Sequence, residues 1–357
     1  MVSHTLVVRL DSVGDVLLAG PAVRAAAEGS DRVTMLVGPL GEAAARLLPG
    51  VDEVLAWHCP WIAADPPQVR ADDVARLVGS LASRGIDRAL VLTSFHQSPL
   101  PTALALRLAG IPWIGAISDD YPGTLLDLRH RVDPMLPEAE RALSLARAAG
   151  FDLAAGDCGR LGVRRPLPDV SALLATSRPV VLHPGTSVPA RAWPGERHRE
   201  TAARLVARGY DVVVTGSRAD AVLTAEVCDG TGAADLGGRT TLTELAAVLA
   251  RAAAVVVANT GPAHLAAAVG TPVVSLFAPT VPARRWAPYG VPLRLLGDQH
   301  AACRDTRATT CPVPGHPCLA SVTAEEVVSA VEELIGLDAG RQASSAMNVA
   351  DPEEVRA

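Results

Sequence analysis

The stretch Asn259-Thr260-Gly261-Pro262-Ala263-His264-Leu265 lies between two apolar runs, residues 254–258 and 271–277. This order predicts a buried strand, a tight loop, a helix and a second strand, as in a parallel α/β sheet. Thr260 can cap the helix, Pro262 suits its first turn, and Gly261 lets another group approach the backbone closely. Because a helix start presents free N–H groups and a positive dipole end, the loop predicts an anion site.

The same alternation of strands and helices extends over most of the chain. Strands are expected at 5–9, 33–37, 51–55, 88–92, 179–183, 211–215, 254–258, 273–277 and 293–296. Helices are expected at 15–28, 41–48, 71–84, 137–149, 196–208, 219–228, 242–251 and 323–335. We therefore predict an α/β protein of two Rossmann-like, doubly wound domains that face a cleft. The domains are predicted at 1–165 and 179–335, with a linker within 152–178 and a flexible tail at 336–357.

Composition narrows the class of protein. The chain has 357 residues, of which 49% are hydrophobic and 20% charged, and this is typical of a globular protein. Its net charge of −6 argues against a nucleic-acid binder, which usually carries a basic surface. The sequence contains no lysine, so any side chain that clamps a phosphate must be arginine.

No signal peptide is evident, and we expect a cytoplasmic monomer. Residues 252–283 carry no Asp, Glu or Arg, but Asn259, His264 and several prolines interrupt them, so they read as a buried strand-helix-strand unit. Peripheral contact with a membrane surface is left open.

Six cysteines are present, and Cys303, Cys311 and Cys318 cluster near His300 and His316. Their spacing includes no C-x₂-C pair, so a structural metal site competes with a cysteine-bearing surface loop, and we assign no metal.

Four segments at predicted strand ends carry polar groups suited to catalysis or anion binding. They are Arg9–Asp15, His183–Ser187, Arg191–Pro194 and Asn259–His264. Each has a plain structural explanation, such as helix capping by Asp15 or a surface position for Arg191. Four such segments at matching strand ends nevertheless favour a ligand site, because ligands of these sheets bind at the carboxyl ends of strands. Walker A, G-x-G-x-x-G, H-E-x-x-H and G-x-S-x-G motifs are absent.

These segments together resemble glycosyltransferase family 9, the bacterial ADP-heptose:lipopolysaccharide heptosyltransferases and their relatives. The matching stretches are Arg9–Pro21, His183–Ser187, Arg191–Pro194 and Asn259–Leu265, with Asp235–Leu242 and the cysteine run in support. The resemblance covers about residues 5–335. It implies a GT-B fold and an inverting, metal-independent transfer of heptose from an ADP-sugar, with no cofactor.

The resemblance also implies roles for single residues. Asp15 would be the general base, and Arg191, in place of a lysine of the family, would contact the donor diphosphate. Asn259 stands where the family has Asp, which removes a negative charge from the donor site. The implied donor-site residues are Gly185, Thr186, Ser187, Gly216, Asp220, Thr240, Leu242, Asn259, Thr260, Gly261, Pro262 and His264. The loop after the first strand would bind the acceptor through Asp11, Ser12 and Gly14.

The sequence leaves alternatives open for the identity of the acceptor and for the class of protein. Lipopolysaccharide is the usual acceptor of the family, but residues 1–150 hold 13 Arg against 17 acidic residues and show no basic surplus for an acidic acceptor. A small molecule such as an aminocyclitol or a nucleoside is therefore the alternative acceptor. A sugar-nucleotide epimerase and a catalytically silent sugar-nucleotide-binding module share the architecture; Asn259 favours the silent module, and Asp15 argues against it.

Overall fold

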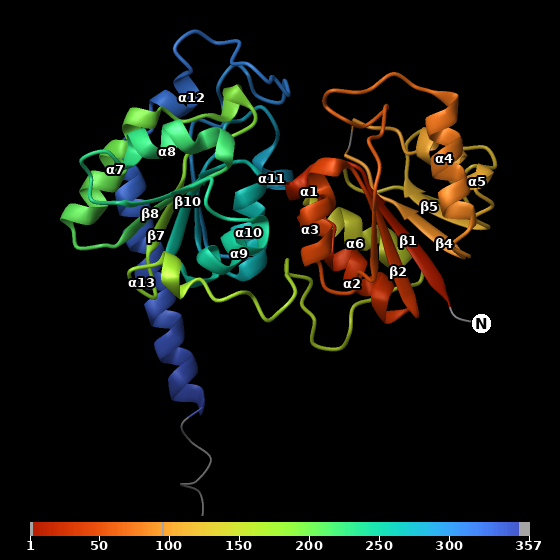
Figure 1. Cartoon of the computed structure of the whole chain (residues 1–357), viewed down its shortest axis with the longest axis horizontal. Coiled ribbons are helices and arrows are strands. Elements are labelled where there is room, and N and C mark those ends of the chain that lie inside the picture. The colour runs from red at the N-terminus through yellow and green to blue at the C-terminus, as the bar shows by residue number, and fades with distance from the viewer. Residues whose placement is uncertain (1–2, 95, 350–357) are drawn as a thin grey trace, which may run out of the picture. The chain divides into compact units, whose positions relative to one another are not determined.

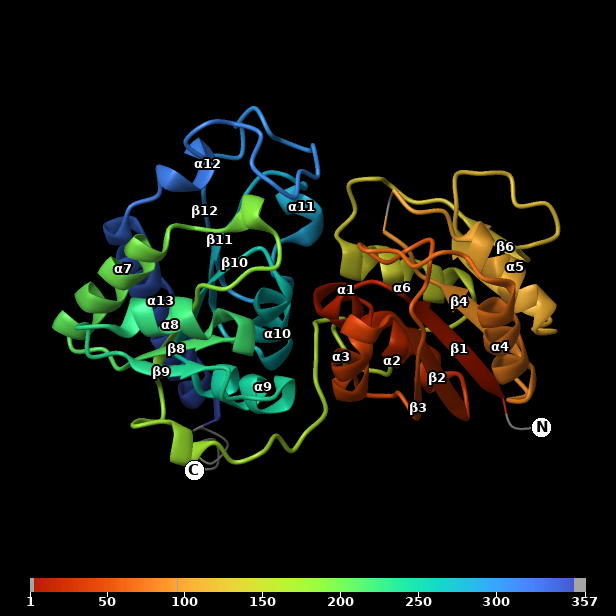
Figure 2. The ribbon, with the colours of Figure 1, turned by 45° about the horizontal axis from the view of Figure 1, so that its top comes forward.

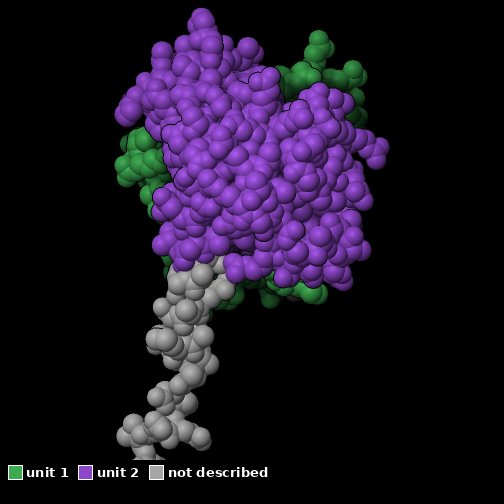
Figure 3. Space-filling view, turned by 90° about the vertical axis from the view of Figure 1, so that its left-hand side faces the viewer, with its two compact units in different colours: residues 1–167, 284–289 green, residues 168–283, 290–357 purple. Residues whose placement is uncertain are grey.

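The computed structural model describes residues 3–94 and 96–349, without the side chains of 338–349. The chain forms two compact units, coloured separately in Figure 3. Unit 1 comprises residues 1–167 and 284–289, and unit 2 comprises 168–283 and 290–357. A short segment late in the sequence, 284–289, therefore belongs to the first unit.

Unit 1 is built on a six-stranded, fully parallel sheet with strand order β3-β2-β1-β4-β5-β6. Its strands are β1 (His4–Arg9), β2 (Arg32–Val37), β3 (Glu53–Ala56), β4 (Arg88–Val91), β5 (Trp113–Ile117) and β6 (Leu128–His130). The helices α1 (Val13–Leu18), α2 (Gly20–Glu28), α3 (Glu42–Leu47) and α6 (Glu138–Ala148) pack on one face (Figure 1). The helices α4 (Ala71–Ala82) and α5 (Leu100–Leu108) cover the other face.

Unit 2 repeats this plan with the order β12-β11-β10-β7-β8-β9. Its strands are β7 (Val180–His183), β8 (Val212–Gly216), β9 (Ala234–Gly237), β10 (Ala254–Ala258), β11 (Val273–Leu276) and β12 (Leu293–Leu296). The helices α7 (Gly195–Ala207), α8 (Ala221–Cys228) and α13 (Ala324–Val349) lie together on one face, while α9 (Leu242–Arg251) and α10 (Gly261–Val269) lie on the other (Figure 2). The short helix α12 (Pro317–Ala320) completes the set, whereas α11 (Ala283–Trp286) lies, apart from its first residue, in the 284–289 segment of unit 1.

Both sheets have the doubly wound order 3-2-1-4-5-6 when their strands are numbered within each unit. The order reverses between β1 and β4 in unit 1, and between β7 and β10 in unit 2. Loops that leave the carboxyl ends of these strands diverge to opposite faces, and this opens the crevice where such sheets bind ligands. The fold predicted from the sequence, two parallel α/β units of the GT-B class, is confirmed.

The apolar runs form the core as expected. All residues of β10 and β11 are buried, because helices cover both faces of a parallel sheet, and such strands read as continuous Val-rich runs. Among the described residues, no helix combines the length and apolar character that crossing a bilayer requires.

Two parts of the secondary-structure prediction are wrong. The expected helix 15–28 is two helices, since Pro21 lacks the N–H and clashes with the carbonyl four residues back. Helix α13 also continues past 335 to Val349; the flexible tail expected at 336–357 stays a prediction, and residues 350–357 lie outside the described residues. Six elements were not predicted, namely α5, β5, β6, β9, α11 and α12.

Helix α13 offers a test of the unit 2 core. Leu334 is fully buried within the core of this unit, and Leu337 is 48% exposed on the same helix. Leu334→Ala should lower the free energy of unfolding by about 2–4 kcal/mol, because it removes buried methyl groups and leaves a cavity. Leu337→Ala, the matched control, should change it by less than about 0.5 kcal/mol. Urea denaturation measures both values, and equal effects would contradict the observed packing of α13.

Candidate functional site

The last residue of β1, Arg9, is buried and gathers the polar groups of the first strand-end loop. Its Nη2 atom donates hydrogen bonds to Asp15 Oδ1 at 2.8 Å and to Ser94 Oγ at 2.9 Å. Its Nε atom forms an ion pair with Asp11 Oδ2 at 2.9 Å. Burial opposes the charge on this guanidinium, but the carboxylates of Asp11, Asp15 and Glu138 outweigh that cost and raise the pKa of Arg9.

Asp15 lies in the first turn of α1, and its side chain is 20% exposed. The Ser12 hydroxyl donates to Asp15 Oδ2 at 3.0 Å, while Ser12, at the helix N-cap, makes no side-chain cap bond. Helix capping therefore does not account for Asp15. Its carboxylate is fixed from both sides, by a guanidinium and a hydroxyl, and keeps an accessible edge.

Asp11 completes this group, together with a residue that the sequence did not indicate. The Gln97 amide donates to Asp11 Oδ1 at 2.6 Å, from the loop that follows β4. Burial raises the pKa of Asp11 to about 6, although Arg9 acts in the opposite direction. The polar residues of unit 1 thus meet at the switch point between β1 and β4, and Gly14 lies buried beside them.

Three further charged residues that sequence reasoning missed surround Arg9. Glu138 and Arg141 come from α6, and Arg285 from α11. All three are buried, with 2%, 7% and 3% of their surface exposed. In the sequence, Glu138 and Arg141 are charged residues within the Ala- and Leu-containing helix α6. Charged residues on the exposed side of a helix give the same pattern, so the sequence did not mark them as site residues.

In unit 2, the loops after β7 and β8 meet around Asp220. A Cβ atom built on Gly185 would lie 2.4 Å from Asp220 Cγ, so only glycine lets the carboxylate lie this close to the backbone. Asp220 Oδ2 accepts hydrogen bonds from the backbone N–H of Ser217 at 2.8 Å and from its hydroxyl at 2.6 Å. Gly216 is equally close, since its Cβ would lie 2.9 Å from Asp220 Cβ. The predicted donor residues Gly185, Gly216 and Asp220 are therefore neighbours.

Asn259 and Arg191 join the loops after β7, β10 and β11. The Asn259 side chain accepts a hydrogen bond from Ala278 N and donates one to Ala278 O, both at 3.3 Å. Arg191 Nη1 donates to the backbone carbonyl of Asn259 at 3.0 Å. Arg191 is therefore anchored at the switch point between β7 and β10 and is not a surface arginine.

Helix α10 begins at this point. Thr260 occupies the N-cap position without a side-chain cap bond, so the predicted capping by Thr260 is wrong. Gly261 and Pro262 are half-buried and His264 is buried. Pro262 has no backbone N–H and Ala263 N donates to Thr260 O at 3.0 Å, so the first turn offers an anion the backbone N–H of Gly261 and the positive end of the helix dipole.

The remaining predicted donor residues lie at the same carboxyl edge of the sheet. Thr186 Oγ1 accepts a hydrogen bond from Val188 N at 3.2 Å, and Ser187 is exposed. Thr240 and Leu242 follow β9 and flank Thr241, whose hydroxyl caps α9 by accepting from Glu244 N at 3.2 Å.

Comparison with known proteins assigns the family. Residues 74–316 match the model of glycosyltransferase family 9 (heptosyltransferase). The chain belongs to this family. It is 29% identical over 229 residues to lipopolysaccharide heptosyltransferase 2 of Escherichia coli K12, an alignment that covers 58% of this chain and 64% of that relative. The chain thus spans somewhat less than two thirds of this curated relative.

Solved structures share the fold at low identity. A glycosyltransferase of family 9 from Veillonella parvula superposes with a TM-score of 0.73 at 18% identity, covering 93% of this chain and 97% of that one. The E. coli heptosyltransferase WaaC with ADP-2-deoxy-2-fluoro heptose gives a TM-score of 0.70 at 21% identity, covering 92% and 99%.

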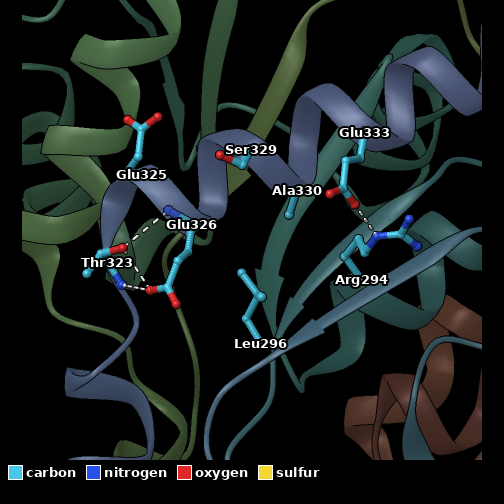
Figure 4. A pocket seen from close by; sticks show the side chains of 8 residues that line it. All are labelled: Arg294, Leu296, Thr323, Glu325, Glu326, Ser329, Ala330 and Glu333. Carbon is cyan, nitrogen blue, oxygen red and sulfur yellow. Dashed lines mark hydrogen bonds and ion pairs between the residues drawn. The ribbon is translucent and has the colours of Figure 1, made fainter.

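A hollow of about 390 Å³ lies away from the strand-end loops of unit 2 (Figure 4). It lies between Arg294 and Leu296 of β12 and the first turns of α13, where Arg294 Nε pairs with Glu333 Oε2 at 2.6 Å. Thr323 and Glu326 at its rim form a capping box, in which each side chain accepts a hydrogen bond from the backbone N–H of the other residue. None of the predicted site residues lines this hollow.

The cysteine cluster lies in and just after the largely exposed loop that follows β12. Cys303 and Cys318 are buried in the core of unit 2, and Cys311 is half-buried. Apolar neighbours explain this, since a free thiol packs as a small hydrophobic group. Within residues 3–94 and 96–349, no group of three or more His, Cys, Asp or Glu side chains is arranged to hold a metal ion.

Two histidines of unit 2, at the end of β7 and in α7, are buried. His183, the last residue of β7, has Nδ1 2.9 Å from Thr215 Oγ1, and His198 packs edge-on against Trp193. Burial lowers the pKa of His183 to about 4, with Asp220 opposing, and lowers that of His198 to about 3, with His183 adding to the effect. Both rings are therefore neutral at neutral pH.

These pKa values predict a loss of stability in acid. The folded-state values lie below the unfolded value of about 6.5, so the stability is fully present above that pH and is lost as pH falls toward 4. His198→Asn should reduce the difference in unfolding free energy between about pH 7 and pH 5 by about 1–2 kcal/mol. Urea titrations at the two pH values give this difference, and the exposed His58→Asn serves as control. An unchanged difference in His198→Asn would refute the assignment.

Proposed function

We propose that the protein transfers a heptose from an ADP-heptose-type donor to an acceptor hydroxyl, with inversion and without a metal. The observation that carries this proposal is the Asp15 carboxylate, fixed by Arg9 and Ser12 at the switch point of unit 1. A general base must be held in place and ionised, and the Arg9 guanidinium favours the ionised form.

Unit 2 would hold the donor. Family membership and the solved complex of WaaC with ADP-2-deoxy-2-fluoro heptose support an ADP-sugar. Arg191 and the first turn of α10 supply positive charge for a diphosphate at the β7–β10 switch point. Asp220 Oδ1, on the carboxylate whose Oδ2 is bonded to Ser217, is suited to accept from a ribose hydroxyl.

The proposed reaction is a single displacement. Asp15 accepts the proton of the acceptor hydroxyl as its oxygen bonds to the anomeric carbon, and the bond from that carbon to the diphosphate oxygen breaks. Attack opposite the leaving group inverts the anomeric centre. Negative charge grows on the departing ADP, where Arg191 and the Gly261 N–H at the start of α10 stabilise it by about 3 kcal/mol per donor. Because these groups supply the charge, we expect turnover to persist in a chelator.

For the acceptor, we propose a saccharide such as those used by the lipopolysaccharide heptosyltransferases of the family, with a small aminocyclitol or nucleoside as the alternative. The charge around Asp15 supports the small-molecule alternative. Three arginines at the site, Arg9, Arg141 and Arg285, are balanced by three carboxylates, Asp11, Asp15 and Glu138. This group of residues therefore has no excess positive charge with which to bind an acidic acceptor.

Asn259 does not require a silent module. Its amide meets one N–H and one carbonyl of Ala278 at once, and an ionised carboxylate cannot donate to that carbonyl. The residue therefore has a structural role in joining β10 to β11, independent of any contact with the sugar. An Asp15 fixed in this charged surrounding favours an enzyme over a binding module.

The base assignment is tested with Asp15→Asn, which preserves shape and removes basicity. We expect kcat for ADP release from ADP-heptose to fall by about 10²–10⁴-fold in the presence of EDTA. Asp120→Asn, on the exposed loop after β5, is the control. Near-wild-type kcat in Asp15→Asn would overturn the assignment, and loss of wild-type turnover in EDTA would overturn the metal-free mechanism.

The donor assignment is tested with Arg191→Met. Removing this guanidinium should raise the KM for the ADP-sugar and lower kcat/KM by about 10²-fold, since a charge on the leaving diphosphate is lost. Arg199→Met, on the exposed side of α7, should leave both constants unchanged. Unaltered kinetics in Arg191→Met would remove this residue from the site.

A further inference from the structure

The segment 284–289 is tied to α6 by two side chains. Arg285 donates from Nε to Glu138 Oε1 at 3.0 Å, and its Nη2 contacts the same oxygen. The Tyr289 hydroxyl donates to Glu140 Oε1 at 3.0 Å. Although β11 and β12 on either side of this segment belong to unit 2, the segment itself belongs to unit 1 and places a buried guanidinium there.

Glu138 is shared among three guanidiniums. While Oε1 binds Arg285, Oε2 lies 3.8 Å from Arg9 Nη1 and 3.8 Å from Arg141 Nη1. Arg141 is held separately, since its Nη1 donates to the carbonyl of Thr93 at 2.5 Å. Burial lowers the pKa of Arg141 to about 10, while Glu138 opposes this change. Glu138 is therefore the carboxylate that the buried arginines of α6, α11 and β1 have in common.

The charges around Asp15 are balanced and interdependent. Arg9, Arg141 and Arg285 face Asp11, Asp15 and Glu138, in a region where solvent screens little. Asp119 also faces Arg141, and Ser94 and Gln97 add neutral hydrogen bonds from the β4–α5 loop. Removing one member of such a buried set leaves an uncompensated charge that the others must absorb.

We propose that Glu138 and Arg285 are positioning residues for the general base. They fix the guanidinium of Arg9, and through Arg9 they set both the orientation and the proton affinity of the Asp15 carboxylate. This inference rests on the proposed function in assigning Asp15 as base. Glu138 Oε2 lies beside Arg9 and Glu138 Oε1 binds Arg285, so both residues act on Asp15 through Arg9.

The two residues have opposite expected effects. Glu138→Gln removes a negative charge, so Arg9 binds Asp15 more strongly and the pKa of Asp15 falls. Arg285→Gln leaves Glu138 without its main partner, so Glu138 competes for Arg9 and the pKa of Asp15 rises. Each shift should be on the order of one pH unit. The double variant Glu138→Gln/Arg285→Gln removes one charge of each sign and should return the pKa of Asp15 toward the wild-type value.

The experiment follows kcat against pH for the full chain with ADP-heptose and acceptor. The acid limb of the profile should move to lower pH in Glu138→Gln, to higher pH in Arg285→Gln, and back in the double variant. Glu140→Gln is the matched control, because it removes one negative charge from the same helix, at the residue that accepts from Tyr289, without facing Arg9. Its profile should overlay the wild type.

A second measurement separates this inference from the proposed function. Carboxyl ¹³C NMR titration gives the pKa of Asp15 directly, with Asp15→Asn and Asp11→Asn used to assign the signals. If the wild type transfers no heptose, the proposed function fails, and the titration still tests the network. Shifts of the same sign in the two single variants, or the same shift in Glu140→Gln, would overturn the positioning role.

Discussion

A guanidinium is buried at the end of β1, and the arrangement of unit 1 around its site follows from the need to balance that charge. Arg9 cannot lose its proton, and a buried unpaired charge is too costly for a stable fold. Three carboxylates therefore come to it from three places, namely Asp11 in the loop, Asp15 in α1 and Glu138 in α6. The same requirement fixes the side chain of Asp15, so one electrostatic constraint both builds the region and prepares its chemistry.

Unit 2 holds its polar side chains in place through hydrogen bonds to the backbone. At its switch point, the Asn259 amide satisfies both backbone groups of Ala278, and Asp220 takes the N–H and hydroxyl of Ser217. Glycine at 185 and 216 allows the Asp220 carboxylate to approach the backbone. The Gly261 N–H at the start of α10 and the Arg191 guanidinium lie at the same edge of the sheet, which suits an anion whose charge grows during reaction.

The two units thus share one topology but place different kinds of polar group at its switch point. In both units, polar groups follow the two strands at the switch point, β1 and β4 in unit 1 and β7 and β10 in unit 2. At that point the neighbouring loops diverge to opposite faces of the sheet. Unit 1 concentrates carboxylates balanced by arginine, as a proton acceptor needs. Unit 2 concentrates N–H donors around neutral and buried residues, including two histidines whose pKa is lowered by burial.

The sequence by itself determined the parallel α/β class, most strand positions and the strand-end segments around Asp15, Gly185, Arg191 and Asn259, because buried strands and glycine-containing loops are local patterns. It did not reveal that Glu138 and Arg285, 147 positions apart, share one buried charge cluster with Arg9. Nor did it show that Asn259 joins β10 to β11, or that Thr260 leaves the start of α10 uncapped. Those features depend on which side chains meet across the fold, and only the tertiary structure decides where a buried charge or an amide finds its partner.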